Sequence, residues 1–533
     1  MGRTWPVATA GLRRLRFHEA SFDSERVITS GRFEVTLNNI RFANLRTAIS
    51  LSLLTAAALV VHGYHPFVED AEIYLPGVER ILNPKLFPVG REFFESHASM
   101  TLFPNLLAGF FRITHLDFET GLFLWHVASI FLLLLACWEL SGLLFSSASS
   151  RWGAVCLIAG LLTIPVSGTA LYIMDQYLNP RSLATFAAVF SIARLLERKY
   201  IRVLFWLLFA ACVHPLMWVF PFSFCALWIV LEKCERQLWG RLTHKSSAVP
   251  VGLGLFWIPV IQDGSAKYQE SARTHAYFYI QHWAWYEWLG VIAPLIVFWY
   301  VERLARRRQA LMLARVSRAF AIYGLIYFGV ALTVDLPARF DRLARIQPMR
   351  SLHLEYIFLF LCIGGLMGQY VLKDRTWRWI VLFIPLCLGM FLSQRALFER
   401  SAHVEWPGRA PRNEWAQAFL WIRENTPRDA VFALNPEYMS LAGEDEIGFR
   451  CLAQRNRLAD AVKDNGVVSM FPQLSEEWWA QVQAQSAWKD LQMSDFMRLK
   501  QQYGVSWIVL EKPRSVLMTC PYQNGTLEVC ELP

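Results

Sequence analysis

A short acidic stretch follows the first long apolar run of the sequence, where residues 68–84 read VEDAEIYLPGVERILNP. From Tyr74 onward the residues follow helical spacing, and Pro76 near the helix start would place Glu69 and Asp70 at a helix N-terminus. A carboxylate held there is positioned to act as a general base or as a ligand. The alternative is a solvated loop that only caps the helices and takes no part in chemistry.

Cationic side chains occur on a segment further along the chain, DLPARFDRLARIQPMRSLHLEY. Arginine fits phosphate through its bidentate fork, so this segment could hold the charge of a phosphate leaving group. We single out Arg350, which stands alone before the apolar run 351–373. The alternative is an interfacial helix whose arginines contact lipid headgroups or pair with nearby aspartates. The other candidates in this segment are Arg339, Arg342 and Arg345.

Further polar groups stand beside other apolar runs and could contact a substrate. The turn YIMDQYLNPRSL contains Asp175 and Arg181, where a structural helix cap explains the residues equally well. His214 precedes a proline at another turn, and a lone histidine there is more often a satisfied structural group. The last candidates, which occur among Tyr and Trp residues of an expected interfacial belt, are Lys267 and Arg273.

The elements that must position these groups are membrane-spanning helices. Of the 533 residues, 55% are hydrophobic and 18% are charged, which is too apolar for an ordinary soluble protein. The net charge of +9 does not indicate nucleic acid, because Lys and Arg recur between the apolar runs. The ten cysteines show no metal-binding spacing. The composition therefore predicts a polytopic α-helical membrane protein that binds membrane lipids and no nucleic acid.

Eleven apolar runs are long enough, or nearly long enough, to cross a bilayer. They occur at 48–64, 119–146, 152–173, 180–196, 201–213, 216–232, 247–262, 284–302, 318–334, 351–373 and 376–393. The runs 201–213 and 216–232 are short and separated by a proline turn, which predicts a re-entrant pair or two short spans.

The basic loops between these runs predict how the chain is oriented. The polar arm 1–47 is expected to be cytoplasmic, and an odd number of spans then delivers residues 394–533 to the opposite face. The transmembrane domain is then 48–393, with a first outer loop at 65–118. Within this loop the apolar segment 99–114 should lie as an amphipathic helix in the interface, since a crossing would invert every later basic loop.

Residues 394–533 are predicted to fold as an extracytoplasmic α/β domain. NEWAQAFLWIRENTPRDAVFALNP indicates a helix, a turn and a strand, and YGVSWIVLEKP indicates a buried strand. Asn524-Gly525 is a strong hairpin signal between Cys520 and Cys530, which predicts a disulfide across the hairpin in an oxidising compartment. Asn524 also begins a glycosylation sequon, but the turn explains these residues better.

The order of these features resembles the GT-C superfamily of integral-membrane glycosyltransferases. The features are the acidic pair before IYLPGVERIL, interfacial helices, many spans and an outer domain that begins with WIRENTPRDAVF. The segments RLADAVKDNGVVSMFP and YGVSWIVLEK are similar to bacterial members. The resemblance implies a protein of the bacterial inner membrane that uses a polyprenyl-phosphate-linked sugar as donor. It also implies an acidic catalytic pair close to a helix that contains Tyr74.

An inverting sugar transfer needs a carboxylate that accepts the proton of the attacking hydroxyl, and cations that hold the charge of the departing phosphate. Asp70 is our first choice as the base and Glu69 the second. The two carboxylates could also bind Mg²⁺ or Mn²⁺, and they would serve equally well without a metal. The acceptor, a glycan, a lipid or a protein, is not specified by the sequence.

Two other functions compete with an enzyme. A catalytically inactive GT-C-like protein could act as a scaffold for cell-envelope assembly, and its C-terminal domain would suit that role. A lipid or solute transporter should instead show internal repeats and ionisable groups at the bilayer midplane. We find no such repeat, and apart from Glu139 and a few helix-end residues the charged groups lie at the ends of the runs.

Overall fold

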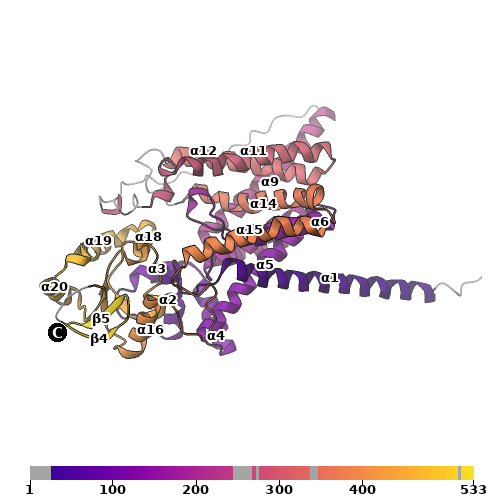
Figure 1. Cartoon of the computed structure of the whole chain (residues 1–533). Coiled ribbons are helices and arrows are strands. Elements are labelled where there is room, and N and C mark those ends of the chain that lie inside the picture. The colour runs from indigo at the N-terminus through magenta and orange to yellow at the C-terminus, as the bar shows by residue number, and fades with distance from the viewer. Residues whose placement is uncertain (1–25, 244–266, 270, 272–274, 336–345, 514–517) are drawn as a thin grey trace, which may run out of the picture. The chain divides into compact units, whose positions relative to one another are not determined.

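The computed structural model describes residues 26–243, 267–269, 271, 275–335, 346–513 and 518–533 (Figure 1). The chain divides into two units, Met1–Ser52 and Leu53–Pro533, and helix α1 (Arg26–His62) extends across their boundary. The sheet, the cavities and all the other helices discussed here belong to the second unit.

The protein is a helical multi-span membrane protein. Over the described residues, seven helices are long and apolar enough to cross a membrane. Only 6% of the apolar window of α15 is buried, as expected of a helix whose side chains face lipid. The seven are α1 with its apolar part Asn44–His62, α5 (Phe118–Leu144), α9 (Pro215–Thr243), α11 (Trp285–Arg307), α12 (Leu311–Asp335), α14 (Leu352–Met367) with the turns before and after it, and α15 (Thr376–Leu397).

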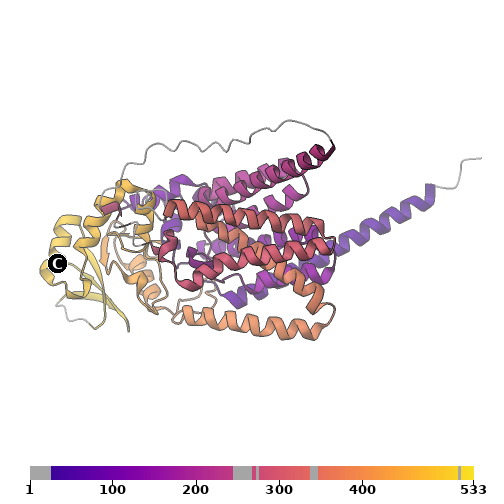
Figure 2. The same ribbon diagram turned by 90° about the horizontal axis from the view of Figure 1, so that it is seen from above.

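Three shorter helices pack among these spans, and Figure 2 shows the bundle from above. They are α6 (Ala148–Gly160), α7 (Pro180–Leu196) and α8 (Tyr200–Val213). Helix α7 is buried along its whole length between α5 and α8, and α6 packs against α14. The predicted number of eleven spans is therefore supported only in part, and the run 247–262 lies outside the described residues.

The prediction of one continuous span over 152–173 is wrong. Helix α6 ends at Gly160, and the chain continues as an irregular buried segment. Pro165 cannot donate a helical hydrogen bond, and it instead pairs with Tyr172 in an isolated bridge. The break expected between the two short runs does occur, at His214, although α9 extends to Thr243.

Residues 65–118, the predicted first outer loop, contain three helices, α2 (Ala71–Leu82), α3 (Glu92–Met100) and α4 (Phe103–Thr114). Helix α2 begins directly after Asp70, as predicted, but Pro76 lies inside it and not at its start. The segment 99–114 contains the expected amphipathic helix, since α4 buries one face through Phe103, Leu107 and Phe111. Its position relative to a membrane stays a prediction.

Residues 394–533 fold around a five-stranded sheet with the order β2-β1-β3-β5-β4. Strands β2, β1 and β3 are parallel, whereas β5 is antiparallel to β3 and to β4. The helices and strands of this region are α16 (Glu414–Asn425), β1 (Val431–Leu434), α17 (Arg450–Ala453), β2 (Asn456–Arg457), α18 (Lys463–Met470), α19 (Ser475–Ala484), α20 (Met493–Tyr503), β3 (Trp507–Glu511), β4 (Thr519–Gln523) and β5 (Leu527–Glu531). The predicted helix and strands at α16, β1 and β3 are therefore present.

Short 3-10 and π turns complete the described elements. They are η1 (Ser167–Thr169), η2 (Ala276–Phe278), η3 (Ile280–His282), η5 (Pro348–Ser351), η6 (Gly368–Leu372), η7 (Tyr438–Ser440), η8 (Pro472–Leu474) and η9 (Trp488–Asp490).

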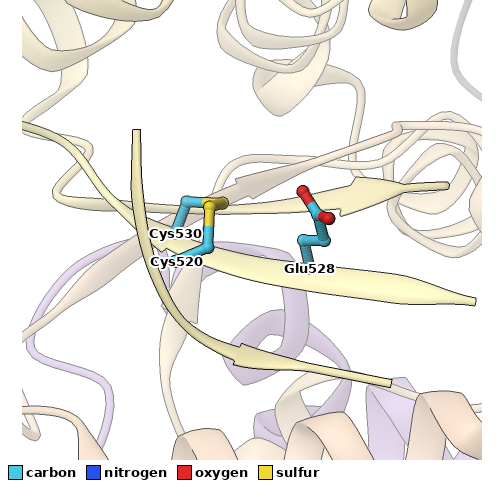
Figure 3. Close-up of side chains that lie close together, drawn as sticks. All are labelled: Cys520, Glu528 and Cys530. Atoms are coloured by element: carbon cyan, nitrogen blue, oxygen red, sulfur yellow. A yellow bond between two sulfur atoms is a disulfide. The ribbon is translucent and has the colours of Figure 1, made fainter. Parts of the chain in front are cut away.

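The hairpin β4–β5 carries a disulfide between Cys520 and Cys530 (Figure 3). At its turn, Asn524 Oδ1 accepts the backbone N–H groups of Thr526 and Leu527. Glu528 stands beside the two sulfur atoms. Since the sulfurs are bonded to each other, this cluster offers no thiolate ligands to a metal.

The C-terminal region packs directly on the helices of residues 65–118, and Figure 1 shows α2 and α3 beside it. Helix α17 contacts α2, and α18 contacts α3. Val68 and Ile447 form an isolated antiparallel bridge, and on either side of it Glu69 N–H donates to the Glu446 carbonyl at 3.1 Å and Gly448 N–H to the Phe67 carbonyl at 2.7 Å. Backbone hydrogen bonds therefore fasten the acidic stretch to the C-terminal region.

Candidate active site

Two loops of the C-terminal sheet reach the acidic pair. Strands β1 and β2 are parallel, so the loops that follow them leave the sheet at the same edge. The loop after β1 carries Glu446, and the loop after β2 leads into α18, whose first residue is Lys463. Both side chains lie against Glu69, which shows that this edge of the sheet forms part of the candidate site.

Asp70 lies between two cations. Lys463 Nζ is 3.4 Å from Asp70 Oδ1 and also contacts Glu69 Oε2. Arg181 Nη2 is 4.0 Å from Asp70 Oδ2, and the Tyr177 hydroxyl accepts the Asp70 backbone N–H at 3.4 Å. The Asp70 side chain nevertheless stays 31% exposed. It is thus ion-paired and still accessible to a small molecule.

The backbone of the hydrogen-bonded residues Glu69 and Glu446 adopts a conformation that is rare outside glycine. Glu69 has φ of 56°, and Glu446 has φ of 52°. Left-handed backbone costs a non-glycine residue free energy, and such residues cluster at functional sites. The two strained residues are joined by the hydrogen bond between Glu69 N–H and the Glu446 carbonyl.

The charge state of the three carboxyl groups follows from their neighbours. Desolvation raises the pKa of Asp70, but Lys463, Arg181 and Arg350 together hold it below its usual value. The pKa of Glu69 is also lowered overall, because the Lys463 charge and the hydrogen bond with Glu446 outweigh desolvation. Burial and the nearby Glu69 raise the pKa of Glu446 to about 9. At neutral pH, Asp70 and Glu69 are therefore ionised, while Glu446 is protonated.

Asp175 holds Arg181 in place. Asp175 Oδ2 accepts Arg181 Nε–H at 3.1 Å and Nη2–H at 2.7 Å, as well as Asn179 Nδ2–H at 2.6 Å. Asn179 Oδ1 in turn accepts the Ser182 backbone N–H at 2.9 Å and caps α7. The structural explanation therefore applies to Asp175, whose effect on the site is to position the guanidinium beside Asp70.

Arg350 differs from Arg181 because none of the described carboxylates forms an ion pair with it. It lies in η5, and its guanidinium is 5.9 Å from the centre of the Tyr277 ring. Among the described residues the side chain has no hydrogen-bond or ion-pair partner, and its Nε is buried without one. A half-buried guanidinium with unused donors is suited to receive an anion.

Two cavities meet at these residues. The polar cavity, of about 470 Å³, is lined by Glu69, Tyr177, Glu446 and Lys463 among others. The apolar cavity, of about 350 Å³, has a wall made mostly of apolar and aromatic side chains. That wall includes Ile73, Tyr74, Met100, Leu216, Phe278 and Met470. Both cavities are lined by Asp70, Arg181, Tyr277 and Arg350.

The remaining sequence candidates have different positions. Tyr74 and His214 line the apolar cavity, and His214 Nδ1 accepts the Met217 backbone N–H at 3.4 Å. Lys267 pairs with Glu476 and lines neither cavity. The candidates that lie outside the described residues are Arg273, Arg339, Arg342 and Arg345.

Sequence reasoning missed Lys463, Glu446, Tyr177 and Tyr277. Lys463 belongs to the segment RLADAVKDNG, which was noted only for its resemblance to other proteins. Its position just after a short strand was the available signal, since ligands often bind at the carboxyl ends of parallel strands. Glu446 occurs in a polar loop sequence that reads as solvated, and no local pattern distinguishes it.

The carboxylates of the site do not fit a divalent metal ion as they are placed. Among the described residues, the only convergent group of three metal-ligand types is Cys520, Glu528 and Cys530, far along the chain from the acidic pair. The Lys463 ammonium already contacts Glu69 and Asp70. A cation bound between these two carboxylates would face that ammonium at close range.

The third acidic residue of the stretch has a different role. Glu72 is fully buried, and its Oε2 accepts the Arg450 backbone N–H at 2.7 Å. Its Oε1 lies 3.1 Å from Arg457 Nε and 3.4 Å from Arg450 Nη1. Arg450 also forms a bidentate pair with Asp464, with both distances 2.8 Å. This buried network attaches the C-terminal region to α2.

Among known proteins, the similarity lies with solved structures and not with sequences. No family model and no curated protein matches the sequence. The fold is similar to that of the oligosaccharyltransferase of Archaeoglobus fulgidus in its apo form, with a TM-score of 0.45 and 11% sequence identity. The match covers 88% of this chain and 69% of the archaeal one. Because the TM-score is below 0.5, we base no functional conclusion on this likeness.

Proposed function

We propose that the protein is a membrane glycosyltransferase that moves a sugar from a polyprenyl-phosphate donor to an acceptor hydroxyl. The observation that carries the proposal is the wall shared by the two cavities, which includes an ionised carboxylate and an arginine that has no ion-pair partner among the described residues. A two-substrate transfer needs such a meeting point, with a base on one reactant and a cation for the leaving group of the other.

The two cavities suit two chemically different substrates. The apolar wall around Phe278 and Met470 suits the lipid end of the donor, whose phosphate would reach Arg350. The polar cavity beside Glu69 and Lys463 suits a hydroxyl-bearing acceptor. Both reactants would then contact Asp70 from opposite sides of the shared wall.

In the proposed step the acceptor hydroxyl attacks the sugar carbon that carries the phosphate. The new carbon–oxygen bond forms as the bond to the phosphate oxygen breaks, and its electron pair leaves with the polyprenyl phosphate. Asp70 takes the proton of the hydroxyl, and the configuration at the sugar carbon inverts. Arg350 neutralises the charge that develops on the departing phosphate.

Basic residues at the other ends of the helices support an extracytoplasmic site. Helix α7 begins at the site and is followed at its far end by Arg198 and Lys199, and α11 ends with Arg306 and Arg307. Cytoplasmic loops are enriched in Lys and Arg. The proposed arrangement therefore places the site and the C-terminal region on the outer face of the bacterial inner membrane.

The test is transfer from synthetic polyprenyl-phosphate pentoses and hexoses to acceptors extracted from membranes. We expect Asp70→Asn to lower turnover about 10²–10⁴-fold, the range typical of a lost general base. Glu95→Gln is the matched control, because Glu95 is a carboxylate of the same loop that pairs with Arg80 and Arg91 outside both cavities. If the wild type binds polyprenyl phosphate but transfers no sugar from any donor, the scaffold alternative is favoured.

A further inference from the structure

One residue of the candidate site, Lys463, lies far from the acidic pair in the sequence. Lys463 is separated from Asp70 by 393 positions, and its side chain is only 11% exposed. The ammonium contacts both Glu69 and Asp70, and Glu446 lies beside the same pair. One cation thus stands among three carboxyl groups, in the place where a metal-dependent site would hold its ion.

The backbone of Lys463 is fixed by two other carboxylates. Asp460 Oδ1 accepts the backbone N–H groups of Val462 at 2.7 Å and Lys463 at 2.5 Å. Asp464 Oδ2 accepts the Asp460 N–H at 2.9 Å, and Asp464 is itself held by the bidentate pair with Arg450. These contacts set the direction of the Lys463 side chain before any substrate binds.

The Lys463 ammonium differs from a divalent metal ion in its charge and in the ligands that it requires. An ammonium carries one positive charge and donates three hydrogen bonds, so it can satisfy two carboxylates without the convergent oxygen cage that Mg²⁺ or Mn²⁺ requires. Among the described residues, Glu69, Asp70 and Glu446 do not converge in that way. The site therefore holds a cation between its carboxylates without the ligand geometry of a metal centre.

We propose that Lys463 is the built-in cation of this site, a positioning residue that keeps the Asp70 carboxylate ionised and oriented and takes the place of a divalent metal. This inference rests on the proposed transfer for its catalytic meaning. The expected effect on metal binding does not depend on the proposed transfer, because removing the Lys463 ammonium should leave two adjacent carboxylates that can accept Mn²⁺.

Mn²⁺ binding to the purified full chain tests the inference by electron paramagnetic resonance. Lys463→Ala should bind Mn²⁺ at least about tenfold more tightly than the wild type, because it loses the competing charge. Lys463→Arg keeps a cation at the position and should bind Mn²⁺ as weakly as the wild type. Lys489→Ala is the matched control, since Lys489 is a lysine of the same region with a 74% exposed side chain.

Equal Mn²⁺ affinity of the wild type and Lys463→Ala, with melting temperatures that show both folded, would overturn the inference. If Lys463→Ala fails to fold, Lys463→Gln provides the same comparison with a side chain of similar length. Should an active donor be found, wild-type transfer should be unchanged by EDTA, and a complete loss with EDTA that Mn²⁺ restores would also overturn it.

Failure of the proposed function gives a different result. In that case Mn²⁺ binding would respond to Lys463 as expected, while no variant and no donor would show sugar transfer.

Discussion

Asp70 and Glu72 are two positions apart in one acidic stretch, yet they lie in opposite environments. Glu72 is fully buried against Arg450 and Arg457, and both of its oxygens are used. Asp70 is 31% exposed at the wall of two cavities, with one cation in contact and another at 4.0 Å. The difference separates a carboxylate that holds the fold from a carboxylate that can react.

The comparison shows that the number of partners a carboxylate already has, and not its charge alone, distinguishes the two roles. A buried carboxylate whose partners are all in place has no capacity for a substrate, and breaking such a pair leaves an uncompensated charge. A recessed carboxylate near a cation without a counter-ion can accept a proton or orient a ligand. The same contrast separates Arg450, which has two carboxylate partners, from Arg350, which has none among the described residues.

The largest expected effect is on stability. Glu72→Gln should lower the free energy of unfolding by about 3–5 kcal/mol, because Arg450 and Arg457 lose a buried partner. Asp70→Asn should lower it by less than about 1 kcal/mol, since Glu69 and Asp175 still pair with the two cations. Chemical unfolding in detergent measures both, and equal losses would contradict the division of roles.

Arg350 should affect activity without affecting stability. Arg350→Ala is expected to lower kcat/KM for a polyprenyl-phosphate sugar about 10²-fold, because the leaving phosphate loses its cation. Arg350→Lys should retain part of the activity, since it keeps the charge but loses the fork. Arg202→Ala, at an exposed arginine of α8, is the control. Wild-type donor affinity and turnover in Arg350→Ala would show that the arginine is only an interfacial anchor.

Glu446 should make stability depend on pH. Its pKa rises from the ordinary 4.5 to about 9 on folding, so the folded protein keeps a proton that the unfolded chain releases. Stability should therefore fall as the pH rises from about 4.5 to about 9. Glu446→Gln should flatten this decline, whereas Glu437→Gln, at an exposed carboxylate of the same loop, should not. Melting curves at several pH values give the comparison.

The smallest effect is expected at Tyr177. Its hydroxyl accepts the Asp70 N–H at 3.4 Å, a long and therefore weak hydrogen bond. Tyr177→Phe should lower turnover only a few-fold, with a loss of stability of about 1 kcal/mol. A loss as large as that of Asp70→Asn would show that the tyrosine itself contacts a reacting atom.

Local patterns in the sequence were sufficient for much of the fold. The spacing in NEWAQAFLWIREN predicts α16, the run YGVSWIVLEKP predicts β3, and the Asn-Gly pair predicts the β4–β5 turn. The irregular segment after α6 was missed, because hydropathy alone does not distinguish a buried coil from a span. Pro165 within the run 152–173 was the local signal of a break in the helix.

Only some residues of the candidate site could be predicted from the sequence. Glu69, Asp70, Arg181 and Arg350 stand beside apolar runs, where a charge needs an explanation and is noticed. Lys463 and Glu446 lie in a polar region, where charged residues are ordinary. Long-range contacts, such as the packing of α18 on α3 and the bridge between Val68 and Ile447, bring them to the acidic pair. Such long-range contacts leave no local trace in the sequence.

The distance along the chain between Asp70 and Lys463 has a consequence for synthesis. The acidic stretch leaves the ribosome 393 residues before the lysine that completes its surroundings. A growing chain therefore contains Asp70 and Glu69 without the Lys463 ammonium until the C-terminal region has been made and has folded. We expect newly made or truncated chains to be inert, so that chemistry at this membrane face begins only when the whole polypeptide is in place.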